Sequence, residues 1–169
     1  MVVLVDQNDH EIGFEEKLKA HQQGLLHRAF SIFIINSKEE MLIQQRALKK
    51  YHSGGLWTNA CCSHPRPGEK IEDAAHRRLQ EEMGFDCQLT KAFDFVYKVH
   101  FEKDDIYEHE YDHVFFGKSD AIVKPDQNEV ENFTWITLNK LTNEVKHHPE
   151  RYTYWFTISL DKVIKTMYP

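Results

Sequence analysis

A chain of 169 residues has the length of one domain and can bury a core that encloses a pocket. Its composition, 41% hydrophobic, 28% charged and 12% aromatic, is typical of a folded domain and argues against disorder. A formal net charge of -6 argues against a nucleic-acid partner held by a broad basic surface, so we expect one domain over residues 1–169 and a small partner.

Neither a membrane span nor a disulfide framework is indicated. No apolar run approaches the roughly 18 residues that span a bilayer, and the first residues, MVVLVDQNDHE, lack the basic region and cleavage site of a signal peptide. The cysteines are Cys61, Cys62 and Cys87, an odd number that leaves at least one thiol free. We expect a cytoplasmic protein with reduced thiols and no membrane partner.

Strands are predicted along most of the chain. A short strand at Val2–Val5 precedes a polar, mixed segment that runs to His27, and AFSIFII follows as a buried strand with MLIQQRA as its hairpin partner. FDFVYKVHF places apolar residues at alternate positions, which indicates a half-buried strand. HEYDHVFFG is expected to return antiparallel to it, and FTWITL adds a further strand.

Three helices are predicted. Apolar residues recur at helical spacing from Lys70 to Met83, and Gly84 stands where a helix commonly ends. Two further helices are expected near the C-terminus, at Leu138–Lys146 and Tyr154–Met167. Short antiparallel strands with a few helices favour an α+β fold, or an α/β/α sandwich in which helices cover a mixed sheet.

Candidate metal ligands lie in three separate segments. Glu108 and Glu110 share one face of a predicted strand, while His21, His27 and His64 add imidazoles from elsewhere in the chain. Such a set suits a divalent metal with mixed nitrogen and oxygen ligands, such as Zn, Mn or Mg. The alternative is a solvated arrangement, because the chain has 11 histidines and 27 acidic residues.

Cys62 is a candidate reactive thiol. It lies two residues before His64, so on extended chain both side chains point to the same side. A nearby cation lowers the pKa of a thiol, so Cys62 could serve as a metal ligand, a nucleophile or a general acid/base. The alternative is a buried, inert cysteine, a role that suits Cys61 better because it should face the opposite way. Cys87 is assigned to packing.

The helix at Lys70–Met83 carries a second pattern, E-x7-R-R-L-x-E-E-x-G-F, which begins at Glu69. It resembles the Nudix signature, in which helical glutamates hold Mg against a diphosphate. Ser63 replaces the first Gly of that signature and Arg78 replaces the Glu that follows its Arg, which weakens a hydrolytic centre but leaves Glu82 able to hold one Mg. The alternative is an ordinary i, i+4 ion pair between Arg78 and Glu82 on a solvated helix.

Three further cations and one tryptophan complete the candidates. Lys17, Arg46 and Lys50 could receive a diphosphate, although each taken alone is more often a surface cation. Trp155 is either a core residue or a π face that stabilises a carbocation.

The segments GLLHRAFSIFIIN, RALKKYHSGGLWTNACCSHPRPGE, AAHRRLQEEMG and YEHEYDHVFF, taken in this order, resemble the type 1 isopentenyl diphosphate isomerase family. The resemblance runs from about Lys17 to Trp155, and it implies a Nudix-like fold adapted from hydrolysis to isomerisation. It also implies interconversion of isopentenyl diphosphate and dimethylallyl diphosphate, a 1,3-allylic shift by protonation and deprotonation in isoprenoid biosynthesis.

The resemblance also implies a role for each candidate residue. The implied metal ligands, for Zn, Mn or Mg, are His21, His27, His64, Glu108 and Glu110, and Glu82 would hold a second ion, Mg, on the substrate diphosphate. Cys62 and Glu110 would transfer protons on opposite faces of the substrate. The implied diphosphate ligands are Lys17, Arg46, Lys50 and Arg78. Tyr97 would be an active-site tyrosine and Trp155 would line the hydrocarbon pocket, although Tyr154 stands where the family usually has Pro.

Two other functions remain as alternatives. One is a Nudix-type diphosphate hydrolase, which Arg78 and the missing Gly disfavour. The other is a binding or structural protein with a structural zinc, which usually requires more cysteine ligands than this chain supplies. We expect a monomer or weak homodimer.

Overall fold

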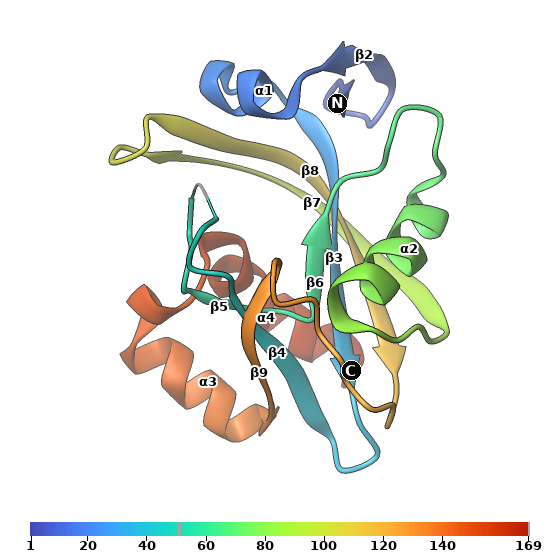
Figure 1. Cartoon of the computed structure of the whole chain (residues 1–169), viewed down its shortest axis with the longest axis vertical. Coiled ribbons are helices and arrows are strands. Elements are labelled where there is room, and N and C mark those ends of the chain that lie inside the picture. The colour runs from blue at the N-terminus through green and yellow to red at the C-terminus, as the bar shows by residue number, and fades with distance from the viewer. Residues whose placement is uncertain (51, 169) are drawn as a thin grey trace.

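The computed structural model describes residues 1–50 and 52–168, in which helices lie on both sides of a mixed sheet (Figure 1). The strands are β1 (Val2–Val5), β2 (Glu11–Glu15), β3 (His27–Ile35), β4 (Glu40–Arg46), β5 (Trp57–Thr58), β6 (Cys61–Ser63), β7 (Leu89–Phe101), β8 (Ile106–Lys118) and β9 (Val130–Thr137). The helices are α1 (Lys17–Gln23), α2 (Ile71–Met83), α3 (Leu138–His147), the 3-10 turn η1 (Pro149–Arg151) and α4 (Tyr154–Met167). None of these helices, within the described ranges, is long and apolar enough to cross a membrane.

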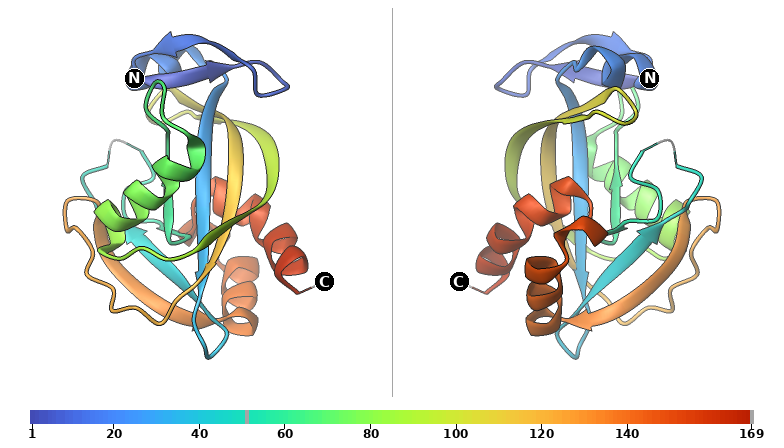
Figure 2. Two further views of the ribbon diagram at one scale, coloured as in Figure 1. Left: turned by 90° about the vertical axis from the view of Figure 1, so that its right-hand side faces the viewer. Right: turned by 90° about the vertical axis from the view of Figure 1, so that its left-hand side faces the viewer.

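Strand β3 divides the hydrophobic core into two layers because its side chains alternate between the two faces of the sheet. Phe30, Ile32 and Ile34 pack in one buried cluster with apolar residues of α2. Phe33 and Ile35 pack in the other with apolar residues of α3 and α4. Figure 2 shows α2 on one side of the long central strands and α3 and α4 on the other. The expected α/β/α sandwich is confirmed.

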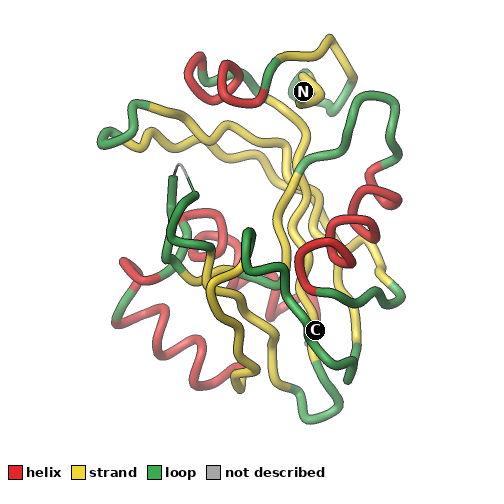
Figure 3. The backbone as a smooth tube through the Cα atoms, viewed as in Figure 1, coloured by secondary structure: helices red, strands yellow, loops and turns green. Residues whose placement is uncertain are grey.

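β3 and β8 lie side by side within the sheet, and β7 continues it from β8 as an edge strand; Figure 3 shows the strands of the sheet in yellow. β3 runs parallel to β8, with His27 opposite Glu110, whereas β7 and β8 form a long antiparallel hairpin in which Tyr97 is opposite Glu110. These two registers bring three candidate site residues from distant parts of the chain to one end of the sheet.

Most predicted elements are present, with two differences. The segment before His27, expected to be irregular, contains β2 and the helix α1, which ends at Gly24 in the left-handed conformation. The expected hairpin between β3 and β4 is paired only where Ile35 meets Met41. Beyond that point β4 leaves β3 and pairs with β9 and β5, while β6 takes the place beside β3. Cys62 and the segment leading to His64 thereby come next to the centre of the sheet.

Candidate active site

Four elements bring the expected metal ligands together. His21 lies on α1, His27 begins β3, His64 follows β6, and Glu108 and Glu110 lie two residues apart on one face of β8. The ligand atoms of the three histidines and of Glu110 all lie within 4.8 Å of one another. His21, His27, Glu108 and Glu110 are buried and His64 is nearly so, which is unusual for a chance group of surface residues.

The distances within this cluster are those of groups that share one small space. His64 Nε2 lies 2.9 Å and His27 Nε2 lies 3.6 Å from the same oxygen of Glu110, Oε1. His21 Nε2 lies 3.3 Å from Oε1 of Glu108. The second oxygen of Glu108 and the Nε2 of His27 are buried with no hydrogen-bond partner in the described part of the chain. Buried polar atoms of this kind indicate a missing partner such as a cation.

The other ring nitrogens support the same interpretation. His21 Nδ1 lies 2.6 Å from the carbonyl oxygen of Lys17, and His27 Nδ1 lies 2.8 Å from that of Leu25. Because a carbonyl only accepts, each Nδ1 carries a proton, and the Nε2 of each ring is turned towards a carboxylate. A divalent metal fits between such groups, and the carbonyls provide the outer hydrogen bonds that commonly orient metal-bound histidines.

The pKa shifts in the cluster follow from its burial and its carboxylates. Burial lowers the pKa of His21, but the hydrogen bond and charge of Glu108 more than offset it and leave the pKa raised. Burial and the charge of Lys17 lower the pKa of His64 to about 3, so His64 is neutral and can act as a ligand at neutral pH. Burial raises the pKa of Glu110, but His27 and His64 outweigh it and hold the pKa well below its usual range.

The sequence analysis missed one histidine of this region. His52 is buried and its Nε2 lies 2.8 Å from Oε1 of Glu108. The only sequence signal for it was its place between Lys50 and the segment WTNACCSHP, and with 11 histidines in the chain that signal was weak.

Cys62 and Glu110 line the same small cavity, together with Tyr97 and Trp155. The Cys62 thiol donates to Oδ1 of Asn59 over 2.9 Å, and the indole N–H of Trp155 donates to its sulfur over 3.1 Å. The hydroxyl of Tyr97 donates to Oε2 of Glu110 over 2.7 Å. The described residues therefore fix the positions of both expected proton-transfer groups with neutral donors and acceptors.

The protein groups around this pair also affect its protonation states. Burial and the carboxyl groups of Asp112 and Glu110 raise the pKa of Cys62 to about 12. The protein groups around the pair thus favour a thiol at Cys62 and a carboxylate at Glu110. Lys17 and Arg46 line the same cavity as Cys62, but the acidic groups have the larger effect on its pKa.

The four expected diphosphate ligands line a larger cavity of about 330 Å³, which also contains Glu82. Lys17, Arg46, Cys62 and His64 border both this cavity and the smaller one, so the two form neighbouring parts of one cleft. The ammonium group of Lys17 borders both cavities, and desolvation there lowers its pKa. A cationic cavity next to a buried cavity suits a ligand with an anionic head and an apolar tail.

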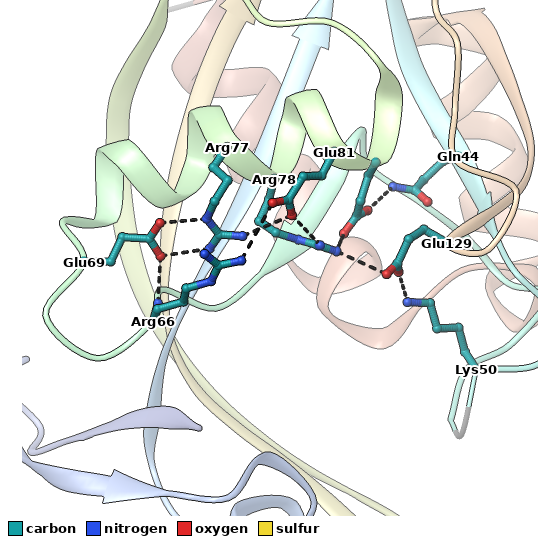
Figure 4. A network of polar contacts seen from close by, with 9 residues as sticks. Gln44, Lys50, Arg66, Glu69, Arg77, Arg78, Glu81 and Glu129 are labelled. Carbon is teal, nitrogen blue, oxygen red and sulfur yellow. Dashed lines mark hydrogen bonds and ion pairs between the residues drawn. The ribbon is translucent and has the colours of Figure 1, made fainter.

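Acidic residues neutralise part of this cationic cavity, as Figure 4 shows. Glu129 lies between Lys50, with which it forms a close ion pair, and Arg78, whose Nη2 is 3.5 Å from its Oε1. Arg78 also forms a close contact with Glu82, and Glu82 accepts a hydrogen bond of 3.1 Å from Gln44. The sequence analysis did not identify Glu129, because it lies far along the chain in the loop before β9.

The remaining parts of the Nudix-like pattern have a structural explanation. Arg77 binds both oxygens of Glu69, with Nε and Nη2 at 2.7 and 2.8 Å, which closes the loop that leads into α2.

Trp155 is buried at the start of α4, and the guanidinium carbon of Arg46 lies 5.3 Å from its ring centroid. The ring thus already lies near one cation of the chain, and stabilisation of a carbocation by Trp155 stays a prediction. Cys61 is fully buried in the core and Cys87 packs at the edge of the same cluster.

Comparison with known proteins identifies the family. The family model described as NUDIX domain matches residues 25–156. The chain is 52% identical over 165 residues to "Isopentenyl-diphosphate Delta-isomerase 2" of Aromatoleum aromaticum, which covers 96% of this chain and 86% of the relative. It is 48% identical over 161 residues to "Isopentenyl-diphosphate Delta-isomerase" of Burkholderia multivorans, covering 95% of this chain and 91% of the relative.

Solved structures support the fold alone, because their sequence identities are low. DR0079 from Deinococcus radiodurans is 18% identical, with a TM-score of 0.77 and 99% of each chain covered. A MutT protein from Methanosarcina mazei is 20% identical, with a TM-score of 0.67 over 85% of this chain and 96% of that one.

Proposed function

The chain belongs to the NUDIX family and, within it, to the isopentenyl-diphosphate Delta-isomerases, and we propose that the cleft described above is its active site. It interconverts isopentenyl diphosphate and dimethylallyl diphosphate. One observation supports the site above all others: Cys62 and Glu110 line a buried cavity with Trp155, directly beside a cavity lined by Lys17, Arg46, Lys50 and Arg78.

The cationic residues bind the diphosphate and fix where the hydrocarbon lies. Arg46 and Arg78 can each bind two phosphate oxygens, while Lys17 and Lys50 act as point charges. With the diphosphate in the larger cavity, a five-carbon chain would point towards the smaller one, whose volume of about 30 Å³ must widen to admit it between Cys62 and Glu110. Binding at the remote diphosphate thereby orients the reacting carbons, which lowers the entropic part of the barrier.

The reaction exchanges one proton for another and requires no redox cofactor. A proton is added to the terminal alkene carbon, which becomes a methyl group and leaves a tertiary carbocation. A second proton then leaves C2, and its bonding electrons form the new double bond. The surroundings favour a thiol at Cys62 and a carboxylate at Glu110. Starting from this state, Cys62 donates the proton to the alkene and Glu110 accepts the proton from C2. In the reverse reaction the two residues exchange these roles. The hydrogen bond from Tyr97 positions Glu110, and the ring of Trp155 stabilises the cation.

The metal requirement follows from the donor sets. Bound Zn, Mn or Mg would be held by His21, His27, His64, Glu108 and Glu110, and a second ion, Mg, would be held by Glu82. The first ion would supply positive charge that keeps its carboxylate ligands ionised, and the second would neutralise charge on the diphosphate. The histidine nitrogens favour a transition metal at the first site, and the carboxylate of Glu82 favours Mg at the second.

One chain supplies every residue of this site, so a monomer or weak homodimer is sufficient for activity, with residues 1–169 acting as one catalytic domain. The three cysteines are free, which suits the cytoplasm, where thiols stay reduced.

Proton NMR tests the proposal directly. The purified protein is incubated with isopentenyl diphosphate and Mg in deuterated water, and the methyl signals of dimethylallyl diphosphate and its deuterium content are followed. Product methyl groups that contain deuterium are the expected result. Unchanged substrate with a folded, metal-loaded protein would contradict it, and release of phosphate from the substrate would instead indicate a NUDIX hydrolase.

A further inference from the structure

His52 has no role in the mechanism above, although it lies at the centre of the site. It belongs to the segment between β4 and β5, which also carries Lys50, and its side chain is 5% exposed. A histidine buried in a connecting segment needs partners for both ring nitrogens. The inference drawn from it rests on the proposed function, because it concerns how the two parts of the same cleft are held together.

The contacts of His52 reach each part of the cleft. Its Nε2 lies 2.8 Å from Oε1 of Glu108, one of the candidate metal ligands. Its backbone carbonyl accepts a hydrogen bond of 3.3 Å from Nη2 of Arg46, in the diphosphate cavity. Its ring stacks on Phe101 at 5.7 Å between centroids and meets the ring of Trp155 edge-on at 6.2 Å.

His52, His21 and Glu108 form a group that could also hold a metal ion, but the hydrogen bonds of His52 allow a different role. His21 and His27 place Nδ1 against backbone carbonyls, so Nδ1 carries a proton and Nε2 is the nitrogen that can bind a metal. His52 instead places Nδ1 3.3 Å from the hydroxyl of Ser53, which can donate to it. Its Nε2 can then carry the proton and donate to Glu108, as suits an outer hydrogen bond to a metal-binding carboxylate.

We propose that His52 is a positioning residue that joins the metal half of the active site to the diphosphate half. Its side chain orients Glu108, and its backbone holds Arg46. The reacting carbons lie between a diphosphate fixed by Arg46 and a carboxylate fixed through the metal cluster. A small change in the spacing of these halves moves the alkene away from the proton-transfer groups.

Two substitutions separate positioning from metal binding. His52→Ala removes the hydrogen bond to Glu108 and loosens the segment that carries Lys50. His52→Gln keeps an N–H close to the position of Nε2 and can still donate to Glu108, but it lacks an imidazole for a transition metal. His100→Gln is the matched control, since His100 is an exposed histidine one residue before Phe101 that contacts Asp105 over 3.1 Å.

The measurements are the dissociation constant of inorganic pyrophosphate with Mg, the transition metal bound per chain, and kcat and KM. We expect His52→Ala to weaken pyrophosphate binding and raise KM by about tenfold, because without the hydrogen bond to Glu108 the segment that carries Lys50 and the carbonyl that holds Arg46 can shift. We expect His52→Gln to remain within about threefold of wild type, with full metal content. His100→Gln should match wild type in all three.

Three results would overturn the inference: unchanged pyrophosphate binding in His52→Ala, equally weak binding in His52→Gln, or metal loss in His52→Gln, which would make His52 a ligand. Because the pyrophosphate measurement needs no turnover, it also separates this inference from the proposed function. If the His52 variants bind pyrophosphate as expected but the wild-type protein fails to isomerise its substrate, only the proposed function is contradicted.

Discussion

Cys61 and Cys62 are adjacent in sequence but have opposite surroundings. On β6 they face opposite sides of the sheet. Cys61 is fully buried in the core beneath α2, whereas Cys62 lines the active-site cavity. Burial raises the pKa of both thiols. The difference between the two thiols is therefore their accessibility to a substrate, because of the two only Cys62 lines the cavity into which a substrate would extend.

The two cysteines make a matched pair for mutagenesis. Cys62→Ala should reduce kcat by about 10³-fold or more, because it removes one of two proton-transfer groups. Cys61→Ala should keep kcat near wild type and lower the free energy of unfolding by about 1 kcal/mol through a small core cavity. Isomerase kinetics together with thermal melting would measure both effects. Substantial turnover by Cys62→Ala would exclude this thiol from the chemistry.

At the scale of elements, the N-terminal end of α2 is held by an ion pair. Glu69 lies just before the helix and accepts hydrogen bonds from Arg77 and from the backbone N–H of Arg66. These bonds, with Arg77 first, lower the pKa of Glu69 to about 2 from its usual 4.5. Because the folded pKa is the lower one, the stabilisation is complete above pH 4.5 and is lost as the pH falls towards 2.

Acid unfolding of a variant tests this linkage. Glu69→Gln should be less stable than wild type at pH 7, by about 1 kcal/mol or less because solvent screens the pair. The difference should shrink as the pH is lowered through the range between the two pKa values, since wild type then loses the same interaction. Urea unfolding at several pH values provides the measurement. A difference that does not change with pH would show that the charge of Glu69 is not responsible.

The C-terminal end of α2 depends on a glycine. Gly84 has a φ of 75°, and a Cβ built there would lie 2.3 Å from the carbonyl oxygen of Lys124. Gly68 has a similar φ of 77°, but a Cβ there would meet nothing within 4 Å. The two glycines therefore share the backbone strain of a left-handed conformation and differ in the steric contact.

Alanine substitutions at these positions should differ accordingly. Gly68→Ala should lower the free energy of unfolding by about 1 kcal/mol, the cost of a left-handed alanine. Gly84→Ala should lower it by about 2–4 kcal/mol, because the loop that contains Lys124 must also move. Denaturant unfolding of both variants checks the comparison, and equal effects would indicate that the loop yields at no cost.

The elements that could be predicted are those with a long, regular apolar pattern. The helices α2 and α4 and the hairpin of β7 and β8 lie where the periodicity placed them. The helix α1 was missed because it has only 7 residues, few of them apolar. The departure of β4 from β3 was also missed, since strand pairing depends on which distant segment competes for the same edge.

The candidate site shows the same division. Cys62, His64, Glu108 and Glu110 stand in sequence motifs, and the resemblance placed them in one site. His52 and Glu129 could not be found this way, because their partners, Glu108 and Arg78, are distant in sequence and meet them only in the folded chain. The parallel register that sets His27 opposite Glu110 is likewise a property of the tertiary structure.

At the scale of the whole molecule, the cluster of candidate metal ligands connects parts of the chain that are far apart in sequence. Its residues come from α1, β3, the segment after β6, and β8. α1 belongs to the N-terminal segment above the end of the sheet, and it packs on β8 through this cluster (Figure 1). A metal bound only by the folded arrangement stabilises all of these contacts together, since the unfolded chain does not hold the ligands in place.

Metal removal should therefore lower stability as well as activity. Dialysis against a strong chelator should abolish isomerisation and lower Tm by about 5–10 °C, as expected for loss of an ion present at about 100 times its dissociation constant. Divalent metal should restore both. His64→Ala should lose the metal-dependent part of Tm, whereas His76→Ala should keep it, because His76 lies on the outer part of α2, where its Nδ1 is 2.7 Å from Asp86. If chelation lowers Tm equally in both variants, the stabilising metal lies elsewhere. If chelation abolishes the activity of the wild-type protein without changing its Tm, the candidate ligands are held in place by their hydrogen bonds alone.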